Sequence, residues 1–122
     1  MHPEAYSIVR LEPDAEVPLW ASGQAFFSVT RTASELSVVC KDCDVPAEAH
    51  AERNRRLLKI EGTLAFSLTG ILASLAAPLA DAQISIFAVS TYDTDYVLVG
   101  NCDLERTIAV LEAAGHTVRS AP

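Results

Sequence analysis

Two runs of polar residues in this sequence have the composition of a binding site for a small charged molecule. The first, Ser67-Leu68-Thr69-Gly70, stands directly before an apolar stretch with helical spacing. The start of a helix presents unpaired backbone N–H groups and a partial positive charge, which suit a carboxylate or a phosphate. Gly70 would let a ligand approach the backbone closely, because glycine has no Cβ. The alternative is that Ser67 or Thr69 simply caps the helix.

The second polar run covers residues 90–96 and lies between two apolar stretches. Asp95 could accept a charge-assisted hydrogen bond from a ligand ammonium group, and the ring of Tyr92 could cover an apolar stem. The alternative is a hairpin loop whose Asp and Thr side chains stabilise the turn. Asp93 and Asp95 also have the spacing of a metal-binding pair, but further carboxylates nearby are missing from the sequence.

Cys40 and Cys43 have the C-x-x-C spacing of metal and redox sites. Together with Cys102 and either His50 or His116 they could supply four zinc ligands, but a closed site normally has a second tight pair of ligands. A redox pair would open a helix, whereas this pair follows an expected strand that ends at Cys40. We therefore expect no metal and no cofactor, with Cys40 buried and Cys43 in a loop.

Residues for catalysis are not apparent. His2, His50 and His116 lie outside both polar runs, and the sequence contains no nucleophile elbow, zinc-protease motif or glycine-rich phosphate loop. We expect a protein that is not an enzyme, and an enzyme built on Cys40 and Cys43 ranks last among the alternatives.

The chain that must position these residues repeats itself. Residues 27–39 recur as residues 87–99 at an offset of 60, and residues 9–12 resemble residues 58–61 at an offset of 49. The difference between the offsets predicts that the second copy carries about three turns of helix that the first has lost. A seam between two copies of one unit is a common place for a small ligand.

The second half of the chain follows a β-α-β-β-α-β order, which is the ferredoxin-like plan. Asp103 is a good N-cap for the second helix, and Gly115 is its expected end. The expected elements are a strand over 57–61, a helix over 70–82, strands over 84–90 and 96–99, a helix from residue 104 and a last strand over 116–119.

The sequence of the first half predicts the same β-α-β-β-α-β order, with a shortened first helix. Its expected elements are a strand over 6–11, one helical turn over 18–23, a hairpin of strands 26–31 and 36–40, and a helix over 46–56 that ends in the solvated run of Arg53, Arg55 and Arg56. The predicted fold class is α+β, with tandem ferredoxin-like units over residues 1–56 and 57–122 and antiparallel sheets with helices on one face.

Composition limits the function further. The chain has 122 residues, of which 50% are hydrophobic and 20% charged, so it can bury a core. Its formal net charge of −7 argues against a nucleic-acid partner. Because apolar runs of about 20 residues and a signal peptide are missing, we expect no membrane partner. Three cysteines, an odd count, fit a reducing compartment, and we expect a cytoplasmic protein.

The segments 59–62, 66–75 and 84–99 resemble the ACT domain, and more narrowly the small tandem ACT proteins of bacteria related to the CASTOR amino-acid sensors. The first-half run 27–39 fits the same family. The resemblance implies a βαββαβ regulatory module that binds an amino acid at a seam between ACT units. The ligand-binding residues it implies are Ser67, Leu68, Thr69, Gly70 and Ile71, near the ligand carboxylate, and Thr91, Tyr92 and Asp95 at the ends of two strands.

A second class of function stays open at this point. The same repeat could serve only as a structural or protein-interaction module that dimerises through its sheets and binds no small ligand. A homodimer is expected for an ACT-like sheet, but the sequence specifies neither the amino acid nor the downstream partner.

Overall fold

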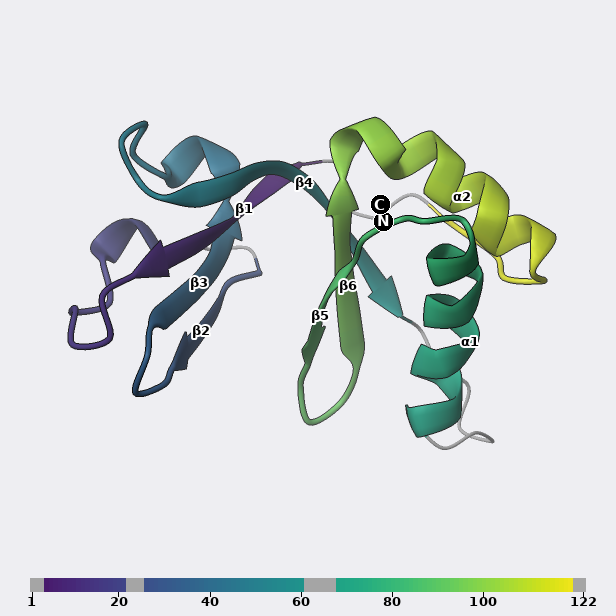
Figure 1. Ribbon diagram of the computed structural model, residues 1–122, viewed down its shortest axis with the longest axis horizontal. Helices are drawn as coiled ribbons and strands as arrows, with labels where there is room; N and C mark the ends of the chain where they lie inside the picture. The colour runs from purple at the N-terminus through teal and green to yellow at the C-terminus, as the bar shows by residue number, and fades with distance from the viewer. Residues whose placement is uncertain (1–3, 22–25, 61–67, 120–122) are drawn as a thin grey trace. The chain divides into compact units, whose positions relative to one another are not determined.

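The computed structural model describes residues 4–21, 26–60 and 68–119. In these residues an antiparallel sheet with the strand order β2-β3-β1-β4-β6-β5 carries two α-helices (Figure 1). Short 3-10 turns, η1 (Leu19–Ala21), η2 (Asp42–Asp44) and η3 (Asn101–Asp103), join some of the elements. The strands are β1 (Ala5–Leu11), β2 (Ser28–Arg31), β3 (Leu36–Lys41), β4 (Ala51–Ile60), β5 (Phe87–Ser90) and β6 (Asp95–Gly100), and the helices are α1 (Leu68–Asp81) and α2 (Leu104–Ala113).

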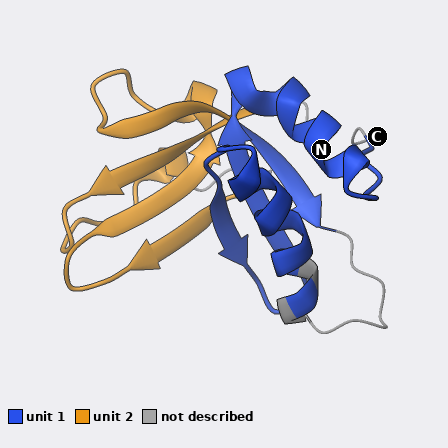
Figure 2. Cartoon of the chain, turned by 45° about the vertical axis from the view of Figure 1, so that its right-hand side comes forward, with its two compact units in different colours: residues 1–3, 56–122 blue, residues 4–55 orange. Residues whose placement is uncertain are grey.

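The chain divides into two compact units (Figure 2). In chain order we call them the first unit (residues 4–55, orange, "unit 2" in the key of Figure 2) and the second unit (residues 56–122 with 1–3, blue, "unit 1" in that key). Strand β4 contributes its first half to the first unit and its second half to the second. The expected α+β class and the antiparallel sheet are confirmed. In the described part of the first unit there is no α-helix, so the expected βαββαβ plan does not hold there.

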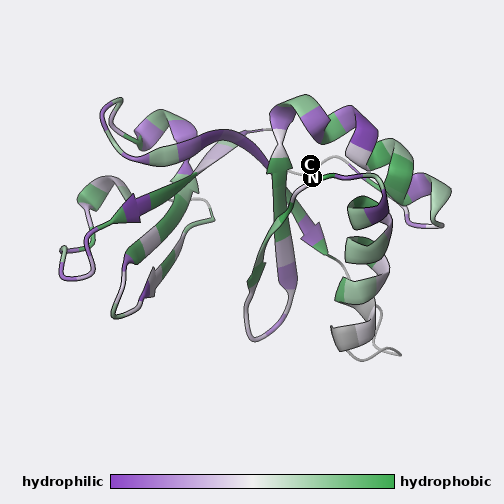
Figure 3. Ribbon diagram, in the orientation of Figure 1, coloured by the Kyte–Doolittle hydropathy of each residue, from purple (hydrophilic) through white to green (hydrophobic). Residues whose placement is uncertain are grey.

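The helix expected over residues 46–56 was wrong, because strand β4 occupies Ala51–Ile60. Burial alternates along the start of this strand, and contacts with other elements override the helical composition of the segment. Arg53 lies 3.5 Å from the Asp42 carboxylate and donates to the carbonyl oxygens of Val45 and Pro46. The polar run that includes it is therefore a part-buried stretch of strand, purple in Figure 3, and not a solvated helix end.

The strand expected over residues 116–119 was also wrong, because these residues belong to no strand in the described part of the chain. Val118 in this segment packs against the core of the second unit. The apolar residue in this segment is therefore explained by packing of the Val118 side chain on the core, and not by a place in the sheet.

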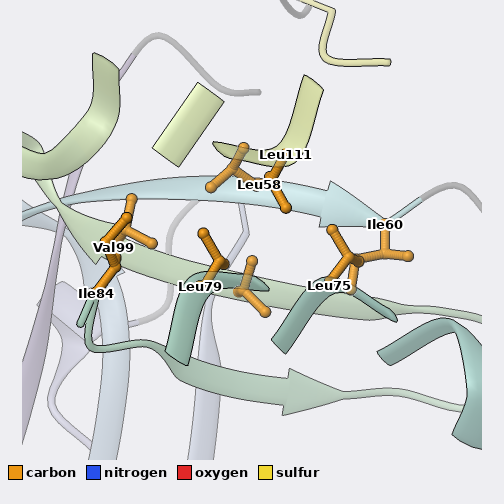
Figure 4. Close-up of a cluster of buried hydrophobic side chains, with 8 residues drawn as sticks. Leu58, Ile60, Leu75, Leu79, Ile84, Val99 and Leu111 are labelled. Carbon is orange, nitrogen blue, oxygen red and sulfur yellow. The ribbon is translucent and has the colours of Figure 1, made fainter. Parts of the chain in front are cut away.

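The core of the second unit lies between its strands and both helices. Apolar side chains from β4, β6, α1 and α2 point toward one another there (Figure 4). Burying a leucine side chain of this kind contributes about 1.5–3 kcal/mol. The buried members are Leu58, Ile60, Leu75, Leu79, Ile84, Val97, Val99 and Leu111.

The first unit buries its sheet without a helix. One face of β1 and β3 carries Val9, Leu36 and Val38, which are all fully buried. Loop and turn residues pack on this face in place of a helix, among them Trp20 and Val45. The short turn η1 thus stands where the second unit has the fourteen residues of α1.

Both helices end in the same hydrogen-bonded motif. At the end of α1, Gln83 N–H donates to the Ala80 carbonyl and Ile84 N–H to that of Leu79, each at 2.9 Å. At the end of α2, the Gly115 N–H donates to the Glu112 carbonyl oxygen at 3.1 Å, and the His116 N–H donates to the Leu111 carbonyl oxygen at 3.0 Å. This Schellman pattern requires a left-handed residue, and φ is 61° at Gln83 and 97° at Gly115. The expected helix end at Gly115 is confirmed.

We expect Gln83→Gly to raise the free energy of unfolding by about 1 kcal/mol, because a left-handed backbone costs a residue with a Cβ about 1–2 kcal/mol. Chemical denaturation monitored by circular dichroism measures this gain. The matched control is Gly115→Ala, which should lower stability by a similar amount although a Cβ there would meet no atom within 4 Å. Equal stability of Gln83→Gly and the wild type would contradict the conformational explanation.

Candidate functional site

Asp95 is a buried carboxylate at the start of strand β6. Its exposed fraction is 6%, and it lies on the same face of the sheet as Val97 and Val99, two members of the apolar core. Among the described residues, no hydrogen bond or ion pair holds the Asp95 side chain. An acidic residue this little exposed beside an apolar layer is uncommon in proteins, which makes Asp95 a candidate for a functional role.

A hydrogen bond from a threonine hydroxyl connects the turn that precedes Asp95 to the neighbouring strand β4. Thr94 Oγ1 donates to the backbone carbonyl oxygen of Ile60 at 2.6 Å. Ile60 is the last residue of β4, which runs antiparallel to β6, so the end of one strand is fastened to the start of the other. The turn between β5 and β6 and the first turn of α1 lie at the same lower end of this unit in Figure 1.

Thr91 and Tyr92, both expected to bind ligand, lie in the turn between β5 and β6. Thr91 Oγ1 donates to the Thr94 carbonyl at 3.1 Å and accepts from the Thr94 N–H at 3.2 Å, so this hydroxyl shapes the turn. Tyr92 is 98% exposed and projects into solvent. Their contact with a ligand stays a prediction.

The other expected ligand residues lie at the start of α1. The helix begins at Leu68 and contains Gly70, which is exposed in its first turn, so the expected helix is confirmed. Ser67 lies outside the described residues, as do the side chains of Leu68, Thr69 and Ile71. The role of this segment in binding stays a prediction.

The repeat gives Asp95 a counterpart in the first unit. The pairing of Ser28 with Val39 corresponds to that of Phe87 with Leu98, which sets the structural offset at 59. The expected offset of 60 was therefore wrong by one residue, and such a slip exchanges the two faces of a strand. In the corrected register Asp95 corresponds to Leu36, which is fully buried, and not to Glu35.

The sequence analysis did not single out Thr94, whose hydroxyl donates to the Ile60 carbonyl. With the offset of 60 it matched Ser34, a turn residue of the same chemical type. With the offset of 59 it matches Glu35, which lacks a short hydroxyl side chain. The contrast between Glu35-Leu36 and Thr94-Asp95 was the signal that could have found it.

The equivalent turns η2 and η3 hold the remaining candidate residues. Cys43 and Cys102 are exposed in these turns and Cys40 is buried at the end of β3, so the expected places of Cys40 and Cys43 are confirmed. Asp103 has the expected N-cap position of α2, but its carboxylate accepts from Arg106 at 3.3 Å and does not cap the backbone. Within residues 4–21, 26–60 and 68–119, no cluster of three or more His, Cys, Asp and Glu side chains could hold a metal ion.

Burial, with a smaller contribution from the charges of Asp44 and Asp42, raises the pKa of the Cys40 thiol to about 11. We expect a thiol reagent at pH 8 to modify Cys43 and Cys102 quickly and Cys40 only after unfolding, since the thiolate is the nucleophile. A mass spectrum of the alkylated protein measures this. Rapid modification of all three thiols in the folded chain would contradict the assignment.

The same shift predicts how stability depends on pH. The folded pKa of Cys40 lies above the ordinary value of 9.0, so the stabilisation is complete below pH 9 and is lost as the pH rises toward 11. In the Cys40→Ala variant the free energy of unfolding should fall less over this range than in the wild type.

The described residues of the second unit form a three-stranded part of an antiparallel sheet with two helices, an α+β arrangement. The ACT domain model matches residues 50–113, and the chain belongs to the ACT domain family. A second family model, of an N-terminal domain, matches residues 4–48. No helix among the described residues is long and apolar enough to cross a membrane.

Relatives support this assignment. The human protein CASTOR3P is 35% identical over 92 residues, which cover 65% of this chain and 56% of the human protein. The chain thus spans about half the length of that homologue. The crystal structure of Atu0741 from Agrobacterium tumefaciens has a TM-score of 0.93 at 39% identity and covers 99% of this chain and 90% of its own.

Two more distant structures share the fold alone. Aspartate kinase from Clostridium acetobutylicum, described as an allosteric enzyme, has a TM-score of 0.70 at 17% identity and covers 93% of this chain and 33% of its own. VC0802 from Vibrio cholerae, a protein of unknown function, has a TM-score of 0.73 at 16% identity and covers 93% of this chain and 85% of its own.

Proposed function

We propose that this protein is a non-catalytic regulatory module that binds an amino acid in its ACT domain. The observation that carries the proposal is Asp95, an acidic residue with an exposed fraction of 6% at the start of β6, for which no hydrogen bond or ion pair is found among the described residues. A ligand ammonium group would supply the missing positive charge through a charge-assisted hydrogen bond. Membership of the ACT family and homology to CASTOR3P support a small ligand.

A zwitterion also needs hydrogen-bond donors for its carboxylate. The backbone N–H groups at the start of α1 are the proposed donors, within the segment Ser67–Ile71. The support is the topology: α1 follows β4 after Ile60, and Thr94, the residue before Asp95, donates a hydrogen bond to the Ile60 carbonyl at that strand end. In this proposal Thr91 shapes the turn beside the ligand, and Tyr92 closes over its side chain.

A thermal-shift screen against the twenty common L-amino acids, each at millimolar concentration, tests the proposal. A ligand at about 100 times its dissociation constant adds about 2.7 kcal/mol to the free energy of unfolding. We expect at least one amino acid to raise the melting temperature, while the analogue that lacks its amino group has no effect. Equal shifts with both compounds, or no shift with any amino acid, would argue against the proposal.

The alternative function, an interaction module without a small ligand, has one observation in its favour. Val17, Leu19, Phe27 and Val29 are large apolar side chains of the first unit with exposed fractions from 36% to 91%. Apolar side chains gathered on a surface often mark a protein–protein contact. Strong self-association in light scattering that no amino acid changes would favour this alternative.

A further inference from the structure

The two hairpins are built alike, which makes their differences informative. The turn between β2 and β3 begins with Thr32, and that between β5 and β6 begins with Thr91. The Thr32 N–H donates to the Glu35 carbonyl at 2.9 Å, and the Thr91 N–H donates to the Thr94 carbonyl at 2.8 Å. Each threonine hydroxyl also accepts from the backbone of its own turn. The two turns therefore have the same hydrogen-bonded frame.

The likeness continues beyond the hairpins. Turns η2 and η3 follow β3 and β6 at the same offset of 59, and each begins after a residue in extended conformation. Within the first unit, Arg53 Nη1 lies 3.5 Å from Asp42 Oδ1, and within the second, Arg56 Nη1 donates to Asn101 Oδ1 at 3.2 Å. Asp42 and Asn101 occupy the same place in the two turns.

Against this common frame, positions 35–36 and 94–95 differ in chemistry. Leu36 pairs with Leu11 across the ladder and is fully buried in the apolar core of the first unit. Asp95 places a carboxylate at the same point of the second unit. Thr94, which replaces Glu35, adds the hydroxyl bond to Ile60 that fastens the hairpin to the preceding strand.

We propose that this two-residue difference confines ligand binding to the second unit, so that the chain holds one ligand and the counterpart place in the first unit is filled by Leu36. Thr94 is a positioning residue in this scheme, because it holds the strand end beside Asp95 without contacting the ligand charge. The inference rests on the proposed function and adds the number of sites and the residues that determine it.

Isothermal titration calorimetry with the amino acid that gives the largest thermal shift tests the inference. We expect a stoichiometry of one ligand per chain in the wild type and no measurable binding to Asp95→Asn. Two ligands per chain, or one ligand that still binds to Asp95→Asn, would overturn it. If the wild type binds none of the twenty amino acids, the proposed function itself fails, and the inference fails with it.

The role of Thr94 is tested with a matched pair of variants. Thr94→Val removes the hydroxyl bond to Ile60 and should weaken binding roughly fivefold with the stoichiometry unchanged, as expected for one lost hydrogen bond. Thr94→Ser should restore wild-type affinity. Thr91→Val removes a hydroxyl that bonds only within its turn and should weaken binding less than Thr94→Val. Equal affinity of Thr94→Val and the wild type would remove Thr94 from the scheme.

Discussion

Replacement of Asp95 by leucine is expected to abolish the response to amino acids and, at the same time, to make the ligand-free protein more stable. Leucine is the residue that the first unit has at the corresponding position, where it is fully buried. In the second unit it would lie among the same kind of neighbours, since Val97 and Val99 share its face of the sheet. The substitution replaces a mostly buried acidic side chain with an apolar one beside the core, so we expect a gain of about 1–2 kcal/mol.

Thr107→Val is the matched control for this prediction. Thr107 is fully buried on α2, and its hydroxyl has no hydrogen-bond partner in the part of the chain that the structure describes. Its replacement by valine should also raise stability, by about 1 kcal/mol, but should leave the ligand response intact. Urea denaturation with and without the amino acid measures both effects. If Asp95→Leu lowers stability, or if it still responds to ligand, then Asp95 has a structural role that we have not assigned.

The reverse substitution in the first unit, Leu36→Asp, is expected to have the largest effect on folding. Leu36 is fully buried in the core of the first unit, in the same cluster as Val9, Val38 and Leu11. A carboxylate there would lose its hydration without gaining a partner. We expect a loss of at least about 3 kcal/mol, the range seen when a buried charge is left unpaired.

The extent of unfolding of Leu36→Asp can be followed by circular dichroism, with Leu36→Asn and Leu36→Met as companions. Leu36→Met conserves volume and should cost less than about 1.5 kcal/mol. Leu36→Asn should fall between the other two, because its side chain is polar but uncharged. Should Leu36→Asp be as stable as Leu36→Met, the corresponding positions would not be equivalent, and the contrast with Asp95 would lose its meaning.

Much of the fold could be predicted from local patterns in the sequence. The hairpins follow from β-branched and aromatic runs that flank short polar turns, and α1 from apolar residues at helical spacing. The segment 46–56 was mistaken for a helix, because Ala, Glu and Arg favour a helix when neighbours are ignored. Strand pairing and the bonds of Arg53 decide its conformation, and neither is visible in a local window.

The candidate site could be predicted only in part. Asp95 was singled out as a possible acceptor for a ligand ammonium group in the polar run between two apolar stretches, and the structure shows this residue buried. Its true counterpart, Leu36, required the register of both hairpins, since the two alignments differ by one residue. Thr94 looked like an ordinary turn residue, and its bond to Ile60 joins residues 34 positions apart in the sequence.

The central feature of the proposed function is Asp95 as the hydrogen-bond acceptor for the ligand ammonium group. A crystal structure of the protein soaked with the amino acid that gives the largest thermal shift tests this directly. We expect density for the ligand ammonium nitrogen about 2.7–2.9 Å from a carboxylate oxygen of Asp95. Ligand density elsewhere in the molecule, with the Asp95 carboxylate bonded to a protein group instead, would contradict the account.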